Sequence, residues 1–231
     1  MNQTARAAVR PAERGAAESP APMRILLVDD HAVVRAGFKT LLENQGDLVV
    51  VAEAESGEAA CRQFVECAPD VVIMDLSLPG IGGIEAIRRI AARQSDARIL
   101  VFSMHEDTVF VEQALQAGAR GYIGKSSAPV VLVEAVRQIA GGNIYIDPDI
   151  AQRLAFQKTK GGDSPFESLS TREFEIFCLL AEGLSVNAIA DRLALSYKTV
   201  ANYATQIKSK LEVSTTAELA RLAIRHGIVT V

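Results

Sequence analysis

The sequence predicts an α/β domain built on a parallel sheet, followed by a smaller domain made only of helices. Between residues 24 and 142, five short apolar runs alternate with amphipathic stretches, a pattern typical of parallel strands covered by helices on both faces. After residue 166 the apolar residues recur at helical spacing. The chain has 231 residues, 49% of them hydrophobic, so it has room for one ordinary domain and a small second one.

The elements of the first domain follow from apolar runs and their breaks. The predicted strands are 24–28, 48–53, the run from Pro69 to Asp75, 98–102 and 121–124. The predicted helices are 31–43, 59–66, one after Gly82-Gly83 with Ile84, Ile87 and Ile90 on its inner face, one capped by Asp107 that closes at 117–119, and one from Pro129 to Gly141-Gly142.

The third strand ends on Asp75, just before the turn Leu78-Pro79-Gly80. Ligands of open α/β sheets bind beyond the carboxyl ends of the strands, so Asp75 is a candidate reactive group. A helix N-cap is the ordinary alternative. The first strand favours the reactive group, because it ends on Asp29 and Asp30 and brings three carboxylates to one sheet edge. At about 5 Å each pair repels by roughly 3 kcal/mol at an effective dielectric of about 20, which requires a cation. Oxygen ligands of this kind suit Mg²⁺.

Two other polar residues end strands at the same edge, since Ser103 follows the fourth strand and Lys125 the fifth. With these residues in this order, the segment 23–142 resembles the bacterial two-component receiver domain. The resemblance implies a flavodoxin-like (βα)5 fold with strand order 2-1-3-4-5. It also implies that Asp75 is the phosphoacceptor, which attacks the phosphohistidine of a sensor histidine kinase.

The resemblance assigns roles to the residues around Asp75. Mg²⁺ would be held by Asp29, Asp30, Asp75 and the backbone carbonyl of Ser77. Lys125 would pair with the phosphoryl oxygens, Ser103 would hydrogen-bond one of them, and Tyr122 would be a switch residue that turns inward when Ser103 moves. The ordinary alternative for Tyr122 is a half-exposed strand aromatic. Ser77 and His105 each stand two residues beyond a site residue, and we hypothesise that they set the lifetime of the aspartyl phosphate.

The remaining boundaries follow from composition. Residues 1–22 are rich in Ala, Arg and Pro and are expected to be a disordered extension. Residues 143–165 are interpreted as a linker with a short helix from Asp147-Pro148 to about 156, and residues 166–231 as the second domain. Cys61, Cys67 and Cys178 lack metal or disulfide spacing and are expected to be small buried apolar residues.

The second domain contains a helix-turn-helix pattern. A first helix starts at Ser170 or Thr171, and a last one spans about 215–226. Between them, a short helix over 186–193 and a tight turn precede a helix over 198–211 with one apolar stripe. The segments 169–173, 181–185, 189–190 and 196–200 resemble the four-helix LuxR-type DNA-binding domain. With the receiver, the chain resembles response regulators of the NarL/FixJ class.

The LuxR resemblance implies that helix 198–211 is the recognition helix in the major groove. The residues that would contact DNA are Lys198, Thr199, Ala201, Asn202, Thr205, Lys208 and Lys210. Asn202 would pair with adenine, Ala201 or Thr205 would meet a thymine methyl, and the lysines would hold phosphates. Three phosphate contacts per subunit would give a dimer a salt slope of about −5. Tyr203, Ala201 and Thr205 replace the basic residues common in this family, which makes dimerisation on DNA more necessary.

Charge is uneven along the chain, because residues 23–150 hold 11 Lys and Arg against 18 Asp and Glu, whereas residues 166–231 hold 7 against 7. No apolar run has the length of a membrane span, so a cytoplasmic protein without membrane contact is expected. The predicted function is a transcription regulator, not an enzyme, with three partners: a sensor histidine kinase, promoter DNA bound as a homodimer, and RNA polymerase. The alternatives are a phosphorylation-independent DNA-binding regulator and an Asp-nucleophile phosphohydrolase, which is disfavoured because Ser77 stands where such enzymes have a second Asp.

Overall fold

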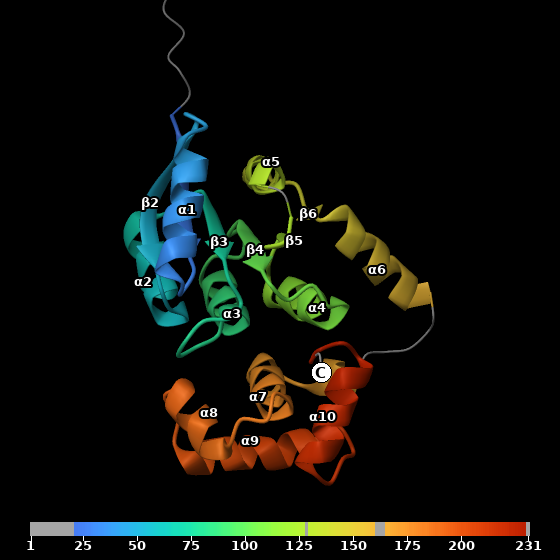
Figure 1. Cartoon of the computed structure of the whole chain (residues 1–231). Coiled ribbons are helices and arrows are strands. Elements are labelled where there is room, and N and C mark those ends of the chain that lie inside the picture. Colours follow the sequence, from blue (N-terminus) through green and yellow to red (C-terminus); the bar gives the residue numbers. More distant parts are fainter. Residues whose placement is uncertain (1–20, 128, 160–164, 230–231) are drawn as a thin grey trace, which may run out of the picture.

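A computed structural model of the chain describes residues 21–127, 129–159 and 165–229. Most of the predicted N-terminal extension and the Gly161-Gly162 part of the linker lie outside the described residues. Figure 1 shows a sheet with helices on both faces and, below it, a separate group of helices.

The sheet is parallel and has the order β2-β1-β3-β4-β5-β6. Its strands are β1 Met23–Val28, β2 Leu48–Ala54, β3 Val71–Met74, β4 Ile99–Ser103, β5 Gly121–Gly124 and β6 Tyr145–Ile146. The predicted order 2-1-3-4-5 is confirmed. β6 was not predicted, because a strand of two residues has no measurable alternation.

Helices cover both faces of this sheet. They are α1 Ala32–Glu43, α2 Gly57–Cys67, α3 Gly83–Arg93, α4 Thr108–Ala117 and α5 Pro129–Ala140. Alternate residues of β1 point to opposite sides: Ile25 and Leu27 pack in the core with α1 and α5, while Leu26 and Val28 pack with α2, α3 and α4. Both faces of the strands are therefore buried, which explains their continuous apolar runs.

α2 starts earlier than predicted, and the cap of α4 differs from the prediction in its hydrogen bond. α2 begins at Gly57 because the Ser56 side chain accepts a hydrogen bond from the Ala59 N–H, two residues before the predicted start. Asp107 is the N-cap residue of α4, as predicted, but its side chain makes no capping hydrogen bond. The Asp107 carboxylate lies beside Gly227 of the second domain instead.

The linker helix is longer than predicted. α6 spans Pro148–Thr159, whereas the expected helix ended near residue 156. It lies against the start of α4, where Arg153 pairs with Glu106 at 3.2 Å and Thr108 hydrogen-bonds Gln157. Gln157, one of the residues that extend α6, thus contacts the first domain in a way that the sequence pattern does not reveal.

The described residues of the second domain form the predicted four α-helices, preceded by a 3₁₀ turn. These elements are η1 Pro165–Ser168, α7 Thr171–Ala181, α8 Val186–Arg192, α9 Tyr197–Lys210 and α10 Thr216–Arg225. Ser170 rather than Thr171 caps α7, in a reciprocal capping box with Glu173. Of the cysteines, Cys178 is buried, whereas Cys61 and Cys67 are only partly buried, so the expectation of burial was wrong for those two.

The two domains are in contact. α7 faces α3 and α4, and a single core cluster runs from the sheet through Phe110 into the second domain (Figure 1). The Gly80 N–H donates to the Arg192 carbonyl at 3.3 Å across the boundary. α9 lies at the end of the molecule that is farthest from the sheet.

Candidate functional site

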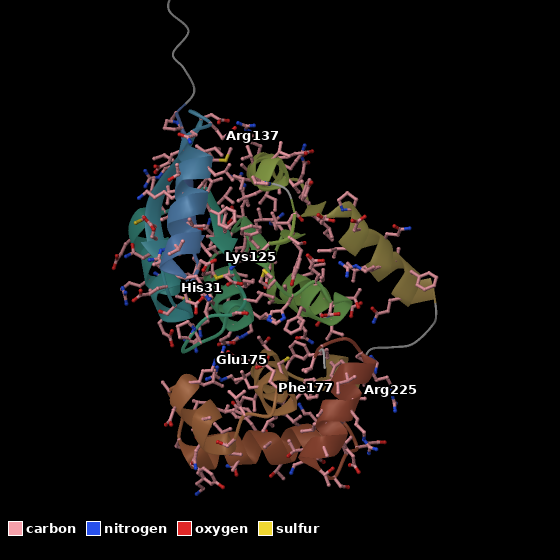
Figure 2. The ribbon with its side chains drawn as sticks, viewed as in Figure 1. His31, Lys125, Arg137, Glu175, Phe177 and Arg225 are labelled. Carbon is pink, nitrogen blue, oxygen red and sulfur yellow. The ribbon has the colours of Figure 1, made fainter. Side chains whose placement is uncertain are left out.

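The ends of β1, β3 and β5 bring Asp29, Asp75 and Lys125 together. Lys125 Nζ lies 2.5 Å from Asp29 Oδ2 and 2.8 Å from Asp75 Oδ2. Both carboxylates are almost fully buried, with 2% and 3% of their surface exposed. Burial opposes the charge of Lys125, but hydrogen bonds to both carboxylates outweigh it and raise the Lys125 pKa. Lys125, which is labelled in the sheet domain in Figure 2, is therefore held as a cation.

Backbone amides fix the second oxygen of each buried carboxylate. Asp29 Oδ1 accepts a hydrogen bond from the His31 N–H at 2.8 Å, and Asp75 Oδ1 accepts from the Leu76 N–H at 2.7 Å. The alternative of a helix N-cap for Asp75 is wrong, because the N-cap of the next helix, α3, is Gly82. The Asp75 carboxylate instead faces a cation at the mouth of the sheet.

A group of possible metal ligands lies at this edge. One ligand atom from each of Asp29, Asp30, His31 and Asp75 lies within 4.8 Å of the others. Three carboxylates fit the oxygen preference of Mg²⁺, and the more exposed Asp30 leaves the site open to water. His31 was not predicted for this site. Its Nδ1 lies 2.7 Å from Asp30 Oδ1, and its only signal in the sequence is its place directly after Asp30.

His105 connects the residues on the other side of Asp75. Its backbone N–H donates to Ser103 Oγ at 3.3 Å, and its backbone carbonyl accepts a hydrogen bond from the Tyr122 hydroxyl. On the ring, Nε2 lies 3.1 Å from Ser77 Oγ. Tyr122 has no exposed surface, so the alternative of a half-exposed aromatic is wrong. Burial lowers the pKa of His105 and raises that of the Tyr122 phenol, so both rings are neutral near pH 7.

The predicted DNA-contacting residues of α9 differ in their exposure and in whether their charge is already paired. Lys198, Asn202 and Thr205 are exposed on neighbouring turns of one face, and Ala201, Thr199 and Lys208 are partly exposed. Lys210 differs, because its Nζ lies 2.6 Å from Glu173 Oε2 and 3.0 Å from the Ser168 carbonyl. The charge of Lys210 is thus already paired within the domain.

Comparisons with known proteins agree with both halves of this geometry. Residues 25–137 match the family model "Response regulator receiver domain", and residues 167–223 match "Bacterial regulatory proteins, luxR family". The transcriptional activator ExaE of Pseudomonas putida is 45% identical over 212 residues, which cover 90% of this chain and 99% of ExaE. The chain belongs to the two-component response regulators. UvrY of Escherichia coli K12, another response regulator, is 43% identical, with 89% and 95% of the two chains covered.

Solved structures of other response regulators show that this response regulator is similar to them in fold as well. The RcsB response regulator of Salmonella typhimurium aligns over 91% of this chain and all of its own, with a TM-score of 0.69 and 28% identity. RcsB bound to a flhDC promoter with a phosphomimetic aligns over 87% of this chain and 97% of its own, with a TM-score of 0.64 and 28% identity. The response regulator is therefore a DNA-binding transcription regulator with a receiver and a LuxR-type domain. Among the described residues, no helix has the length and hydrophobicity needed to span a bilayer.

Proposed function

We propose that Asp75 accepts a phosphoryl group from the phosphohistidine of a sensor kinase and that this modification controls promoter binding through α9. One observation carries the proposal: the buried Asp75 shares the Lys125 cation with Asp29, at 2.8 and 2.5 Å. A carboxylate nucleophile with a cation beside it meets the two needs of phosphoryl transfer, positioning and charge neutralisation.

In the transfer, an Asp75 oxygen forms a bond to phosphorus, and the phosphorus–nitrogen bond of the kinase breaks with its electron pair left on the imidazole nitrogen. Lys125 then pairs with a phosphoryl oxygen, and the Ser103 hydroxyl donates to another. Asp29, Asp30, Asp75 and the Ser77 carbonyl would hold Mg²⁺, which neutralises charge on the phosphoryl group when bound. Ser103 lies next to the Tyr122 and His105 contacts, so its movement would reach both.

For DNA binding we propose that the exposed face of α9 enters the major groove. Asn202 would read an adenine edge and Thr205 or Ala201 a thymine methyl, while Lys198 and Lys208 would contact phosphates. The second domain has no net positive charge, with 7 basic and 7 acidic residues, so two subunits on two half-sites would supply the affinity that one lacks. The relative RcsB is described as dimers bound to DNA, which supports a homodimer here.

The test is phosphorylation of the purified chain by a small acyl phosphate, followed by intact mass measurement and peptide mapping. We expect one phosphoryl group on Asp75, dependent on Mg²⁺, and none on Asp75→Asn. Genomic binding sites of the wild type and Asp75→Asn are then compared. Loss of occupancy in the variant supports the proposal, whereas regulated binding that persists without Asp75 contradicts it.

A second candidate is DNA binding that does not need phosphorylation. It is favoured by the exposure of Lys198, Asn202 and Thr205 while Asp75 is unmodified and the domains are packed together. Equal affinity of the unmodified and phosphorylated chain for the same promoter fragment would select this candidate.

A further inference from the structure

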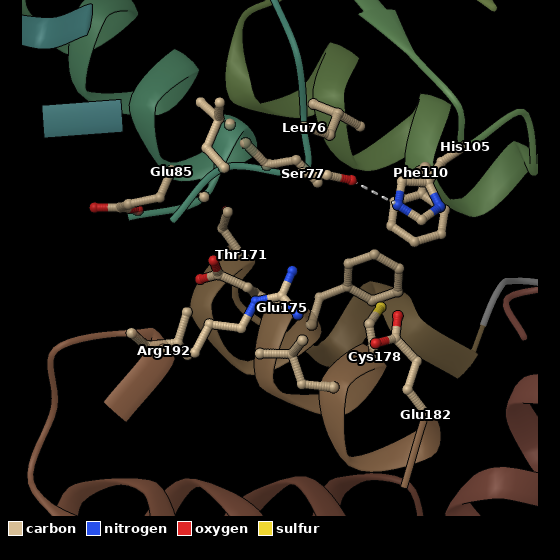
Figure 3. Close-up of a pocket in the computed structure, with 17 residues that line it drawn as sticks. Leu76, Ser77, Glu85, His105, Phe110, Thr171, Glu175, Cys178, Glu182 and Arg192 are labelled. Carbon is tan, nitrogen blue, oxygen red and sulfur yellow. Dashed lines mark hydrogen bonds between the residues drawn. The ribbon is translucent and has the colours of Figure 1, made fainter. Parts of the chain in front are cut away.

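A line of aromatic rings crosses the boundary between the two domains. The His105 ring stacks on Phe110 of α4, with centroids 4.2 Å apart and planes inclined by 15°. Phe110 in turn meets Phe174 of α7 edge to face, at 5.2 Å and 72°. These rings and Ser77 line a pocket between the domains (Figure 3). A side chain of the phosphorylation site is thus joined to the DNA-binding domain by two ring contacts.

His105 is held on several sides by receiver residues. Ser103 Oγ accepts a hydrogen bond from the backbone N–H of His105, and the Tyr122 hydroxyl donates to the backbone carbonyl. Ser77 Oγ forms a hydrogen bond with the His105 ring. Ser103 and Tyr122 are almost fully buried, so a shift of His105 has little free space on the receiver side, whereas the pocket lies on the side of Phe110 and Phe174. Close-packed groups of this kind move between discrete arrangements and do not deform continuously.

We propose that the ring contact from His105 through Phe110 to Phe174 couples phosphorylation of Asp75 to the packing of the DNA-binding domain on the receiver. The inference rests on the proposed function, since it takes Asp75 as the phosphoacceptor. When the phosphoryl group draws Ser103 Oγ toward itself, the His105 N–H loses its acceptor and the His105 segment moves. The Phe110–Phe174 contact is described with Asp75 unmodified, and Phe110 also stacks on His105. Movement of the His105 segment therefore shifts Phe110, so phosphorylation weakens its contact with Phe174.

Coupling between two sites is reciprocal. If phosphorylation loosens the Phe110–Phe174 contact, then a substitution that loosens the contact must favour phosphorylation. The DNA-binding domain would therefore restrain the chemistry of the receiver. A change in α7, which contributes no residue to the group around Asp75, becomes a direct test.

The test compares two phenylalanines of α7 in the full-length chain. Phe174 touches Phe110, whereas Phe177 packs on Phe166 and Phe174 and does not line the pocket between the domains. Both are fully buried, so Phe174→Leu and Phe177→Leu remove the same atoms from the same helical core. Phosphorylation by a small acyl phosphate with Mg²⁺ is followed by intact mass, and thermal melts report the stability lost by each variant.

We expect Phe174→Leu to raise the extent of phosphorylation at sub-saturating donor by about two- to tenfold, the range that one aromatic pair contributes. Phe177→Leu should leave it within experimental error of the wild type. The Gly80 amide, which donates to Arg192 across the boundary, should exchange faster with solvent in Phe174→Leu and in the wild type with the phosphoryl mimic beryllofluoride.

A matched double substitution sharpens the test. Because Phe110 and Phe174 touch, the effect of Phe110→Leu on phosphorylation should largely disappear when Phe174 is already Leu. Equal phosphorylation of Phe174→Leu and Phe177→Leu, or additive effects of Phe110→Leu and Phe174→Leu, overturns the coupling alone. Failure to label Asp75 in the wild type overturns the proposed function and the coupling with it.

Discussion

Ser77 and His105 lie beside Asp75 and bridge β3 to β4 across the mouth of the sheet. Their hydrogen bond of 3.1 Å joins a serine two residues after Asp75 to a histidine two residues after Ser103. Because burial lowers its pKa, the His105 ring is neutral near pH 7 and joins Ser77 without adding charge. We infer that the pair borders the path by which water would approach Asp75.

We predict that Ser77→Ala and His105→Ala shorten the lifetime of the phosphorylated form. Removing either partner opens the bridge, and a lost hydrogen bond of ordinary strength corresponds to about two- to tenfold in rate. The measurement is loss of phosphoryl label after removal of the donor. Ser127→Ala serves as a control, because the Ser127 hydroxyl bonds Asp147 instead. Unchanged lifetimes in the Ser77 and His105 variants contradict the prediction.

Lys125 is the cation that lies between two buried carboxylates. Lys125→Met leaves Asp29 and Asp75 buried without their cation, and breaking a buried pair in this way typically costs about 3–5 kcal/mol of stability. The loss should be partly recovered by Mg²⁺, because a ligand that binds only the folded form stabilises it. Lys39→Met is the control, since its pair with Glu53 is partly exposed and contributes only about 0–1 kcal/mol. Chemical denaturation with and without Mg²⁺ measures both, and equal losses in the two variants contradict the prediction.

The carboxylates, Ser103 and Lys125 could be predicted because parallel strands end at one edge, so a residue at a strand end has a known place. The contacts of His105 could not be predicted in the same way. Its hydrogen bonds to Ser77 and Tyr122 span 28 and 17 residues and depend on how β3, β4 and β5 stack. Lys210 shows the same limit, because its spacing on α9 does not reveal that Glu173 lies across from it.

Two lysines of helix α9 that were both predicted to contact DNA have different surroundings. Lys198 is exposed at the start of the helix, while Lys210 at its end joins α9 to the capping box of α7 through Glu173. Hydrogen bonding to Lys210 contributes to a lowered Glu173 pKa, against the effect of burial, so Glu173 stays ionised at neutral pH. Lys210 therefore holds two helices in place.

We predict different results for Lys198→Ala and Lys210→Ala in DNA binding. Each phosphate contact contributes about 0.9 to the salt slope, so Lys198→Ala should reduce the slope of a bound dimer by about 2. Lys210→Ala should leave the slope unchanged and lower the melting temperature, because it leaves Glu173 unpaired. Affinity for one promoter fragment is measured over a range of salt concentrations. A similar loss of slope in both variants contradicts this assignment.

The elements that sequence patterns predicted well are those with a long apolar period or a capping residue, such as α7 and α9. β6 and the end of α6 were missed because tertiary contacts form them. β6 gains its hydrogen bonds only by pairing with β5, and α6 is held by Glu106 and Thr108. Asp107 occupies the predicted N-cap position, but its carboxylate lies beside Gly227 of the other domain and makes no capping hydrogen bond.

At the scale of the molecule, the packing of α7 on the receiver brings an acidic side chain to the boundary. Glu175 of α7 lies next to Gly82 and pairs with Arg172 at 2.5 Å, with only 19% of its side chain exposed. Burial raises the Glu175 pKa above its ordinary value of 4.5, although Arg172 and the Gly82 amide oppose the rise; Glu85 of the receiver adds to it. The packed arrangement therefore binds the Glu175 proton more tightly than an open arrangement does.

This difference predicts that the contact between the domains weakens as the pH rises. The stabilisation is full below about pH 4.5, where Glu175 is protonated in both arrangements, and is lost as the pH passes through the raised pKa of the packed form. His105 acts in the opposite direction, since its lowered pKa means that the packed form is destabilised when low pH protonates the His105 ring.

Glu175→Gln separates the effect of the glutamate from that of His105, because it keeps the shape of the side chain and leaves His105 in place but removes the titration of residue 175. The radius of gyration from solution scattering should therefore rise less between pH 5 and 8 in Glu175→Gln than in the wild type. Glu182→Gln, which changes another glutamate of the same pocket, should follow the wild type, and an identical pH profile for Glu175→Gln excludes this role.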